Sequence, residues 1–217
     1  MNVIQNLVPQ SKYNIKCPYL MNAKFIVVHN TANDASARDE IAYMIRNDNK
    51  VSFHYAIDDK EIIQGILDNR NAWHAGDGNG PGNRKGIGIE ICYSKSGGKR
   101  FEDAEKLAAK FIAFKLKEKG WGIDKVKKHQ DFSGKYCPHR TLDLGWQRFL
   151  NMVQAELNKL KGGNAVTKPD KNTPSNWAKP SWDWAKKEGF LDGTRPKDPV
   201  TREELAVVLQ RLVKKLG

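Results

Sequence analysis

Two short apolar runs limit the folds that this chain can adopt. "AKFIVVHN" (23–30) is rich in β-branched residues and ends beside a histidine, and "GIGIEICY" (86–93) alternates isoleucines with Gly88, Glu90 and Cys92. Both patterns predict strands, the first buried and the second with its isoleucines on one face. Stretches with helical periodicity lie between and after them. The chain is therefore predicted to be an α/β protein, a sheet with helices packed against it.

Other elements of the first 160 residues follow from similar patterns. Residues 34–49 have helical spacing, and residues 51–58 and 61–67 predict a hairpin. Residues 71–85 are rich in glycine and irregular, which is typical of a long loop that carries function.

Two longer helices are predicted over 102–119 and 142–160, each with one apolar face. The side chains expected inside are Leu107, Phe111 and Phe114 in the first helix and Phe149, Val153, Leu157 and Leu160 in the second.

A change of composition divides the chain near residue 160. Residues 161–176 are polar, contain glycine and proline and lack periodicity, as a linker does. Residues 177–217 predict a small α-helical domain, whose last helix starts with a capping box between Thr201 and Glu204. The side chains expected on the buried face of that helix are Leu205, Val208, Leu209, Leu212 and Leu216.

Charge limits the partners without choosing among them. The formal net charge is +12: residues 1–160 carry 25 basic and 18 acidic side chains, and residues 161–217 carry 12 and 7. A diffuse positive field favours nucleic acid, acidic membranes or anionic wall polymers. No apolar run has the length of a membrane span, and the first twenty residues lack the apolar core of a signal peptide. Three scattered cysteines predict free thiols made in a reducing compartment.

Five histidines are few for 217 residues, so their positions are informative. His29 closes the first apolar run, His129 follows another predicted strand, and Cys137 lies on a glycine-containing loop shortly after. Zinc takes imidazole and thiolate ligands, and a catalytic zinc keeps one position open for water. From composition alone, however, a surface histidine and a small buried cysteine are the better explanation.

Five motifs occur in a fixed order: "FIVVHNT", "VSFHYAID", "AWHAG", "GIGIEIC" and "HQDFSGKYCPH". Together they resemble the zinc-dependent N-acetylmuramoyl-L-alanine amidases that share their fold with peptidoglycan recognition proteins, especially the lysis enzymes of phages and prophages. The resemblance covers residues 1–160. It implies a mixed central β-sheet flanked by helices, one Zn²⁺ ion, and hydrolysis of the amide between N-acetylmuramic acid and L-alanine of the stem peptide. We expect a monomer.

Carried over by position, the resemblance implies that His29, His129 and Cys137 bind zinc and that Glu90 and Lys135 are catalytic. Two neutral imidazoles and one thiolate leave zinc able to lower the pKa of a bound water. Glu90 would take that proton and deliver it to the leaving nitrogen of alanine. Lys135 would help to stabilise the oxyanion of the tetrahedral intermediate.

Four further residues are candidate substrate contacts. Phe53 stands where many relatives have a tyrosine proposed to contribute to catalysis, so that role is absent or is supplied by the two catalytic side chains. His54 is a groove residue, a support for the metal ligands, or a buried histidine with hydrogen bonds. Trp73 and His74 lie in the loop expected to wall the substrate cleft, although simple packing also explains Trp73.

Residues 177–217 resemble an S-layer homology motif, with an aromatic–alanine helix, a "DG" turn and a "TREE" helix start. Such modules bind secondary cell-wall polymers, commonly anionic, and usually occur in several copies, whereas one copy is present here. The resemblance implies wall targeting, with Arg195, Lys197 and Arg202 as the contacts. A helical pair that packs on the first domain or dimerises is the alternative.

Other functions compete with the amidase interpretation. Non-catalytic peptidoglycan recognition modules typically lack the cysteine ligand, so Cys137 together with Glu90 and Lys135 favours an enzyme. Nucleic-acid binding rests on charge alone, because no recognised binding motif supports it, and no membrane partner is expected. We expect synthesis in a bacterial cytoplasm without a signal peptide and action on the wall after release at phage lysis. A bacterial autolysin exported by another route is the alternative.

Overall fold

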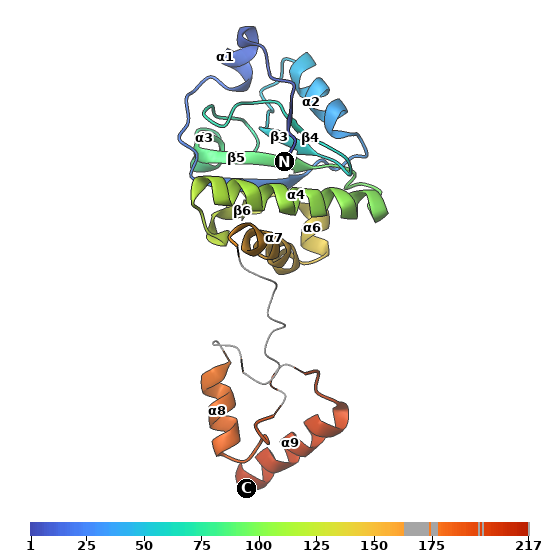
Figure 1. The fold of residues 1–217 in the computed structure, drawn as a ribbon, viewed down its shortest axis with the longest axis vertical. Helices are drawn as coiled ribbons and strands as arrows, with labels where there is room; N and C mark the ends of the chain where they lie inside the picture. The colour runs from blue at the N-terminus through green and yellow to red at the C-terminus, as the bar shows by residue number, and fades with distance from the viewer. Residues whose placement is uncertain (163–173, 175–177, 195, 197, 217) are drawn as a thin grey trace. The chain divides into compact units, whose positions relative to one another are not determined.

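The computed structural model describes residues 1–162, 174, 178–194, 196 and 198–216, and it divides into two compact units (Figure 1). The first unit is Met1–Gly163 and the second is Asn164–Gly217. This division lies close to residue 160, where the sequence predicts the end of the first domain. Most of the predicted linker, 161–176, lies outside the described residues.

Six strands form one mixed sheet in the first unit, in the order β1-β4-β3-β5-β2-β6. The strands are β1 (Ile4–Gln5), β2 (Phe25–Asn30), β3 (Tyr55–Ile57), β4 (Ile62–Gln64), β5 (Gly86–Ile91) and β6 (Val126–Lys128). β3 and β4 form an antiparallel hairpin, whereas β1–β4, β3–β5, β5–β2 and β2–β6 are parallel pairs. The predicted mixed sheet and its hairpin are confirmed, with strands shorter than their sequence patterns.

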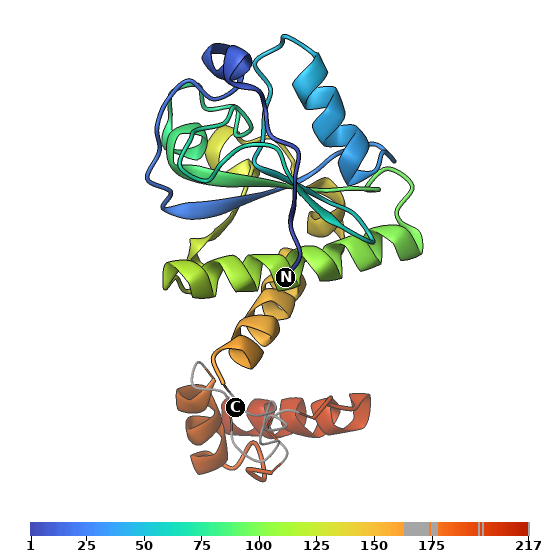
Figure 2. The same cartoon turned by 45° about the horizontal axis from the view of Figure 1, so that its top comes forward.

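Helices cover both faces of this sheet (Figures 1 and 2). α2 packs on β3 and β4 at one face, whereas α4 packs on β3 and β5 at the other face and also contacts α7. The helices of this unit are α1 (Tyr13–Lys16), α2 (Ala37–Arg46), α3 (Pro81–Lys85), α4 (Gly98–Lys119), α5 (Gln130–Ser133), α6 (His139–Asp143) and α7 (Trp146–Leu160). Coverage on two sides explains the continuous apolar run of β2. None of the described helices combines the length and the apolar character needed to cross a membrane.

β5 is covered on both faces as well, although its alternating sequence predicts one polar face. Gly88 and Cys92 are buried, and of the three residues on that face Glu90 alone is partly exposed. The ring of His74 lies over Gly88, where an added Cβ atom would come within 2.6 Å of it. Glycine at this position therefore makes room for a side chain from the loop 71–85.

Two helices differ from their predictions. The helix predicted over 142–160 starts at Trp146, because Gly145 has a φ of 103° and separates it from α6. Phe114 is 36% exposed, so its predicted burial is wrong: α4 turns an alanine-rich stripe with Phe111 toward its neighbours. Of the other side chains predicted inside, Phe111, Phe149, Val153 and Leu157 are buried, and Leu107 and Leu160 are half-buried.

The second unit contains α8 (Lys179–Lys187) and α9 (Arg202–Leu216). The predicted capping box is confirmed: the Thr201 N–H donates to the Glu204 carboxylate at 2.8 Å, and the Glu204 N–H donates to Thr201 Oγ1 at 3.1 Å. Leu205 and Leu209 are 46% and 51% exposed, so their predicted burial is wrong. Val208 and Leu212 are half-buried, and the side chain of Leu216 lies outside the described residues. One short neighbouring helix offers too little surface to cover the apolar face of α9.

A buried lysine ties the N-terminal segment to the end of α2. Lys16 has no exposed surface, and its Nζ donates to Asn47 Oδ1 at 2.7 Å and to the carbonyl oxygens of Asn49 and Val51 at 2.6 and 3.2 Å. Burial is the main cause that lowers the pKa of Lys16. Its three partners also line a surface groove that reaches Glu90. Lys16 therefore holds one wall of that groove in place.

Replacing Lys16 with methionine should destabilise the fold, because its oxygen partners would lose their donor. We expect the free energy of unfolding, measured with urea, to fall by about 2–4 kcal/mol. Lys24 is exposed, so Lys24→Met is the matched control and should change that free energy by about 0.5 kcal/mol or less. Equal stability of the two variants would show that the Lys16 contacts do not hold this segment.

Candidate active site

The neighbouring parallel strands β5, β2 and β6 end at the same edge of the sheet, and each brings a polar residue there. His29 lies near the end of β2 and is paired in register with Glu90 of β5, and His129 directly follows β6. Residues paired across parallel strands point to the same face of a sheet. Strand pairing therefore gathers two imidazoles and a carboxyl group at one place.

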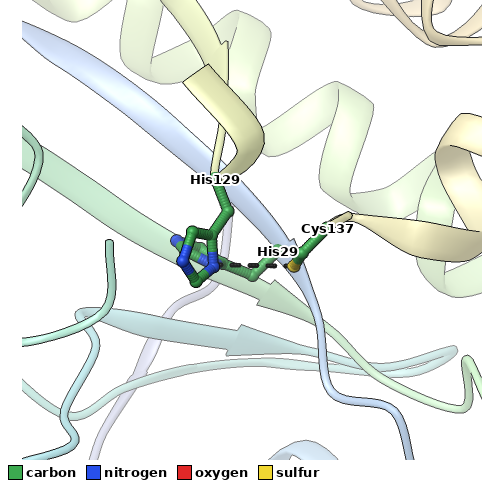
Figure 3. A group of neighbouring side chains, drawn as sticks. All are labelled: His29, His129 and Cys137. Atoms are coloured by element: carbon green, nitrogen blue, oxygen red, sulfur yellow. Dashed lines mark hydrogen bonds between the residues drawn. The ribbon is translucent and has the colours of Figure 1, made fainter. Parts of the chain in front are cut away.

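Cys137 joins this group from the loop that follows α5. The Gln130 N–H donates to the Cys137 carbonyl oxygen at 3.0 Å and closes the loop, which turns at Gly134 with a φ of 75°. Glycine adopts this conformation without strain. Figure 3 shows the three side chains turned toward one another: His29 Nδ1 lies 3.0 Å from His129 Nδ1 and 3.9 Å from Cys137 Sγ.

These three side chains fit a zinc ion. All are buried, and their donor atoms lie within 4.8 Å of one another. Tetrahedral zinc, with bonds of about 2.0–2.1 Å to nitrogen and about 2.3 Å to sulfur, keeps its ligand atoms about 3.3–3.7 Å apart. Imidazole nitrogen and thiolate sulfur are also the ligand types that zinc prefers. His29, His129 and Cys137 are therefore suited to hold one zinc ion and leave a position for a reactant.

Burial keeps the metal-free site uncharged. Burial is the largest cause that lowers the pKa of His29 far below its ordinary value, and burial together with the charge of Lys135 lowers the pKa of His129. Burial also raises the pKa of Cys137 to about 11. At neutral pH the two imidazoles are therefore neutral and the thiol keeps its proton. Metal binding must displace that proton, so metal affinity is expected to rise with pH.

A groove of about 590 Å³ opens beside Glu90, with α2 and the segment after it as one wall and Phe53 in its lining. Glu90 is half-buried, and its Oε2 atom, like Thr31 Oγ1, is enclosed without a hydrogen-bond partner among the described residues. Burial, followed by the charge of Glu40, raises the pKa of Glu90 to about 8, and the charge of Lys135 opposes this shift. A carboxyl group that titrates near neutral pH and lines a groove is suited to general acid–base catalysis.

Residues 19–140 match the family model described as N-acetylmuramoyl-L-alanine amidase. The chain is also 52% identical over 215 residues to the N-acetylmuramoyl-L-alanine amidase CwlA of Bacillus subtilis (strain 168), an alignment that covers 97% of this chain and 78% of CwlA. The chain belongs to the N-acetylmuramoyl-L-alanine amidase family.

Two further comparisons concern the extent of the likeness. The amidase XlyB of the same Bacillus subtilis strain is 62% identical over 158 residues, which cover 72% of this amidase and 50% of XlyB. This amidase therefore matches about half of XlyB. The solved structure of PlyL is similar with a TM-score of 0.70 and 52% identity, covering 76% of this amidase and 100% of the PlyL chain. The mixed sheet flanked by helices is thus shared with the solved structure of PlyL.

Lys135 lies on an exposed part of the loop that leads to Cys137. Burial raises the pKa values of Cys137 and Glu90, and the charge of Lys135 opposes that rise. Burial lowers the pKa values of His29 and His129, and the charge of Lys135 adds to that fall. The structure therefore brings together the five residues to which the sequence assigned metal binding or catalysis. They are His29, Glu90, His129, Lys135 and Cys137.

Of the four predicted substrate contacts, one lies in the groove and three point into the protein. Phe53 lines the groove. His54 has no exposed surface: its Nε2 contacts the Arg70 carbonyl oxygen at 2.9 Å, and its Nδ1 accepts from the Gly88 N–H at 2.9 Å. A direct substrate role for His54 is therefore wrong, and the alternative of a buried, hydrogen-bonded histidine describes it.

The loop residues Trp73 and His74 also turn inward. Trp73 is half-buried, and its Nε1 donates to the Ile15 carbonyl oxygen at 3.0 Å, as the packing alternative requires. His74 is buried, and both of its ring nitrogens contact groups inside the protein. The predicted contact of His74 with substrate is therefore wrong in this structure.

Sequence reasoning missed the groove along α2, including Thr31 and Glu40. The helical pattern of residues 34–49 indicates which side of α2 is apolar. It does not show that the polar side of this helix lines a groove. Thr31 stands in the quoted motif "FIVVHNT", so a signal for it was present. Glu40 has no comparable signal.

The raised pKa of Glu90 should make the metal-free amidase less stable as pH rises. A carboxyl group with a folded pKa of about 8 and an ordinary value of 4.5 costs no stability below pH 4.5, and its cost grows from there to pH 8. Relative to Glu90→Gln, the wild type should lose roughly 2–3 kcal/mol of unfolding free energy between pH 4.5 and pH 7. Chemical denaturation at both pH values measures this difference. Glu102 is exposed, and Glu102→Gln should show no such trend; a flat difference for Glu90→Gln would contradict the shift.

Proposed function

We propose that this amidase binds one Zn²⁺ ion through His29, His129 and Cys137 and hydrolyses the bond between N-acetylmuramic acid and L-alanine in peptidoglycan. One observation carries the proposal: three zinc-type donors lie within 4.8 Å of one another, and one of them, His29, is paired across the sheet with Glu90, which lines a groove. When bound, zinc supplies a Lewis acid that polarises the scissile carbonyl and makes water acidic.

The chain's own residues supply the proton transfers. Glu90 takes a proton from the attacking water and passes it to the leaving nitrogen, because an amide cannot leave as an anion. The enclosed surroundings of Glu90 keep its pKa near the working pH of such a group. Lys135 places a positive charge beside the site, where it stabilises the oxygen of the tetrahedral intermediate.

The groove along α2 is where we place the stem peptide. Its lining combines the polar side chains of Asn33, Asn47 and Asn49 with the apolar ring of Phe53. Amide side chains offer both donors and acceptors to a peptide backbone. Because Glu90 lines the groove, a peptide lying in it would pass beside a catalytic residue.

We propose that the second unit binds an anionic wall polymer. The S-layer-like sequence and the excess of basic residues in 161–217 support this role. Arg202 is exposed at the start of α9, whereas Arg195 and Lys197 lie outside the described residues. A pocket of about 590 Å³ in this unit is lined by Trp182 and Arg211 and also by Asp192, Asp198, Glu203 and Glu204. Its aromatic ring suits a sugar ring, but its carboxylates leave the attraction for an anionic polymer to basic residues outside this pocket. Peptidoglycan lies outside the cell membrane, so we further propose that release at cell lysis, as for a phage endolysin, brings the amidase to its substrate.

Two variants separate metal binding from turnover. Cys137→Ser should lose zinc and activity together, because a serine hydroxyl is a poor zinc ligand. Glu90→Gln should keep one zinc per chain but lose about 10²–10⁴-fold in rate. Zinc is measured by equilibrium dialysis, and the products of peptidoglycan digestion by mass spectrometry, which identifies the bond that is cut. Wild-type protein loaded with zinc that releases no free lactyl carboxyl and alanine amino ends would overturn the amidase proposal.

Removing the second unit should weaken wall binding without stopping hydrolysis. Residues 1–162 should digest purified peptidoglycan at a rate close to that of the full chain, since the site lies within the first unit. Binding to intact walls should fall about tenfold or more, because the second attachment point is lost. Arg202→Glu in the full chain should give part of that loss, and Lys24→Glu is its exposed control. Equal sedimentation of both chain lengths with walls would argue against targeting.

A further inference from the structure

His74 connects the candidate metal ligand His29 to the backbone of β5. Its Nδ1 lies 3.0 Å from His29 Nε2, and its Nε2 lies 3.2 Å from the Gly86 carbonyl oxygen. The other nitrogen of His29, Nδ1, faces His129 and Cys137. Two imidazole rings and one carbonyl therefore form a chain of hydrogen bonds that ends at the metal-binding atoms.

The direction of these hydrogen bonds follows from the carbonyl group. A carbonyl oxygen can only accept, so the hydrogen in the last bond must belong to His74 Nε2. A neutral imidazole has one N–H, which leaves His74 Nδ1 as an acceptor. His29 Nε2 must then carry the hydrogen that it donates to His74. His29 Nδ1 is thereby left as a bare lone pair directed at the other two metal-binding side chains.

We propose that His74 is a positioning residue that holds His29 in the Nε2–H tautomer and so keeps His29 Nδ1 free to bind the metal. The inference rests on the proposed zinc site. A histidine that binds a metal through one nitrogen usually donates from the other to a fixed acceptor, which sets its ring orientation and strengthens it as a ligand. Here the acceptor is a second histidine, whose own orientation is set by the Gly86 carbonyl.

The surrounding residues are arranged to hold His74 in this place. Asn83 is buried, and its Oδ1 accepts from the backbone N–H groups of His74 and Ala75, each at 2.7 Å. Gly88 of β5 has no side chain, and an added Cβ atom would lie 2.6 Å from the His74 ring. The loop 71–85 is thereby fixed at one end of the hydrogen-bond chain, and the strand leaves space for the ring.

Nitrogen-15 NMR of the histidine rings in the metal-free wild type tests the tautomer directly. The His29 signals should report hydrogen on Nε2 and a bare Nδ1. Hydrogen on His29 Nδ1 would overturn the inference. This measurement needs no variant and does not depend on whether the site proves to bind zinc.

Two variants of His74 test its effect on the metal. His74→Leu removes the acceptor, whereas His74→Asn places a carbonyl oxygen near the position of Nδ1 and keeps one. Zinc affinity, measured by competition with a chromophoric chelator, should fall roughly 10- to 100-fold in His74→Leu. It should recover to within a few-fold of the wild type in His74→Asn.

Several outcomes decide between this role and a structural one. Equal losses in both variants would mean that His74 supports the fold rather than the tautomer, and unchanged affinity in His74→Leu would also overturn the inference. Thermal unfolding of each metal-free variant checks that the fold is retained. A wild type that binds no zinc would contradict the proposed function instead, and the NMR measurement would then decide the role of His74.

Discussion

The parallel pairing of β2 with β5 and β6 is the constraint on which the rest of the site depends. It sets His29 opposite Glu90 and leads the chain to His129 at the same edge of the sheet. A slip of one residue would turn every side chain of β2 to the other face. Val28 would then stand where His29 does, and the imidazole would enter the apolar layer on the opposite side. The register is specific because His29 is the buried polar side chain of an otherwise apolar run, and a slip would bury its imidazole away from its hydrogen-bond partners.

Burial decides the charge state of the side chains that this strand pairing brings together. Isolated charges are costly away from water, so a group that cannot find a partner becomes neutral instead. The neutral imidazoles, the protonated Cys137 thiol and the raised pKa of Glu90 all follow from this one cause. A divalent cation among these groups would favour the ionised thiolate and carboxylate, because it would supply the positive charge that these anions lack here. The metal-free site is therefore stable without charge and is prepared for a cation.

The sequence was sufficient for the residues that motifs and strand ends identify. The family resemblance specified positions, so the convergence of His29, His129 and Cys137 could be predicted. β2 and β5 could be predicted because their apolar patterns are strong. The sequence was a poorer guide to which apolar residues of a helix are buried. Phe114, Leu205 and Leu209 have the spacing of core residues, yet their exposure depends on which neighbouring elements are present to cover them. No local pattern contains that information.

The loop 71–85 shows how the structure changes the interpretation of a motif. Its glycines and its "AWHAG" sequence suggest a wall for the substrate, but His74 points inward and contacts His29. Substitutions in this loop should therefore affect the metal ligand His29, and they should change the rate of hydrolysis of all substrates to a similar extent. The α2 groove differs, because none of its described lining residues is one of the three metal-binding side chains. Differences in the stem peptides that amidases accept should accordingly depend on α2 and on the segment that Lys16 holds, rather than on the glycine-rich loop.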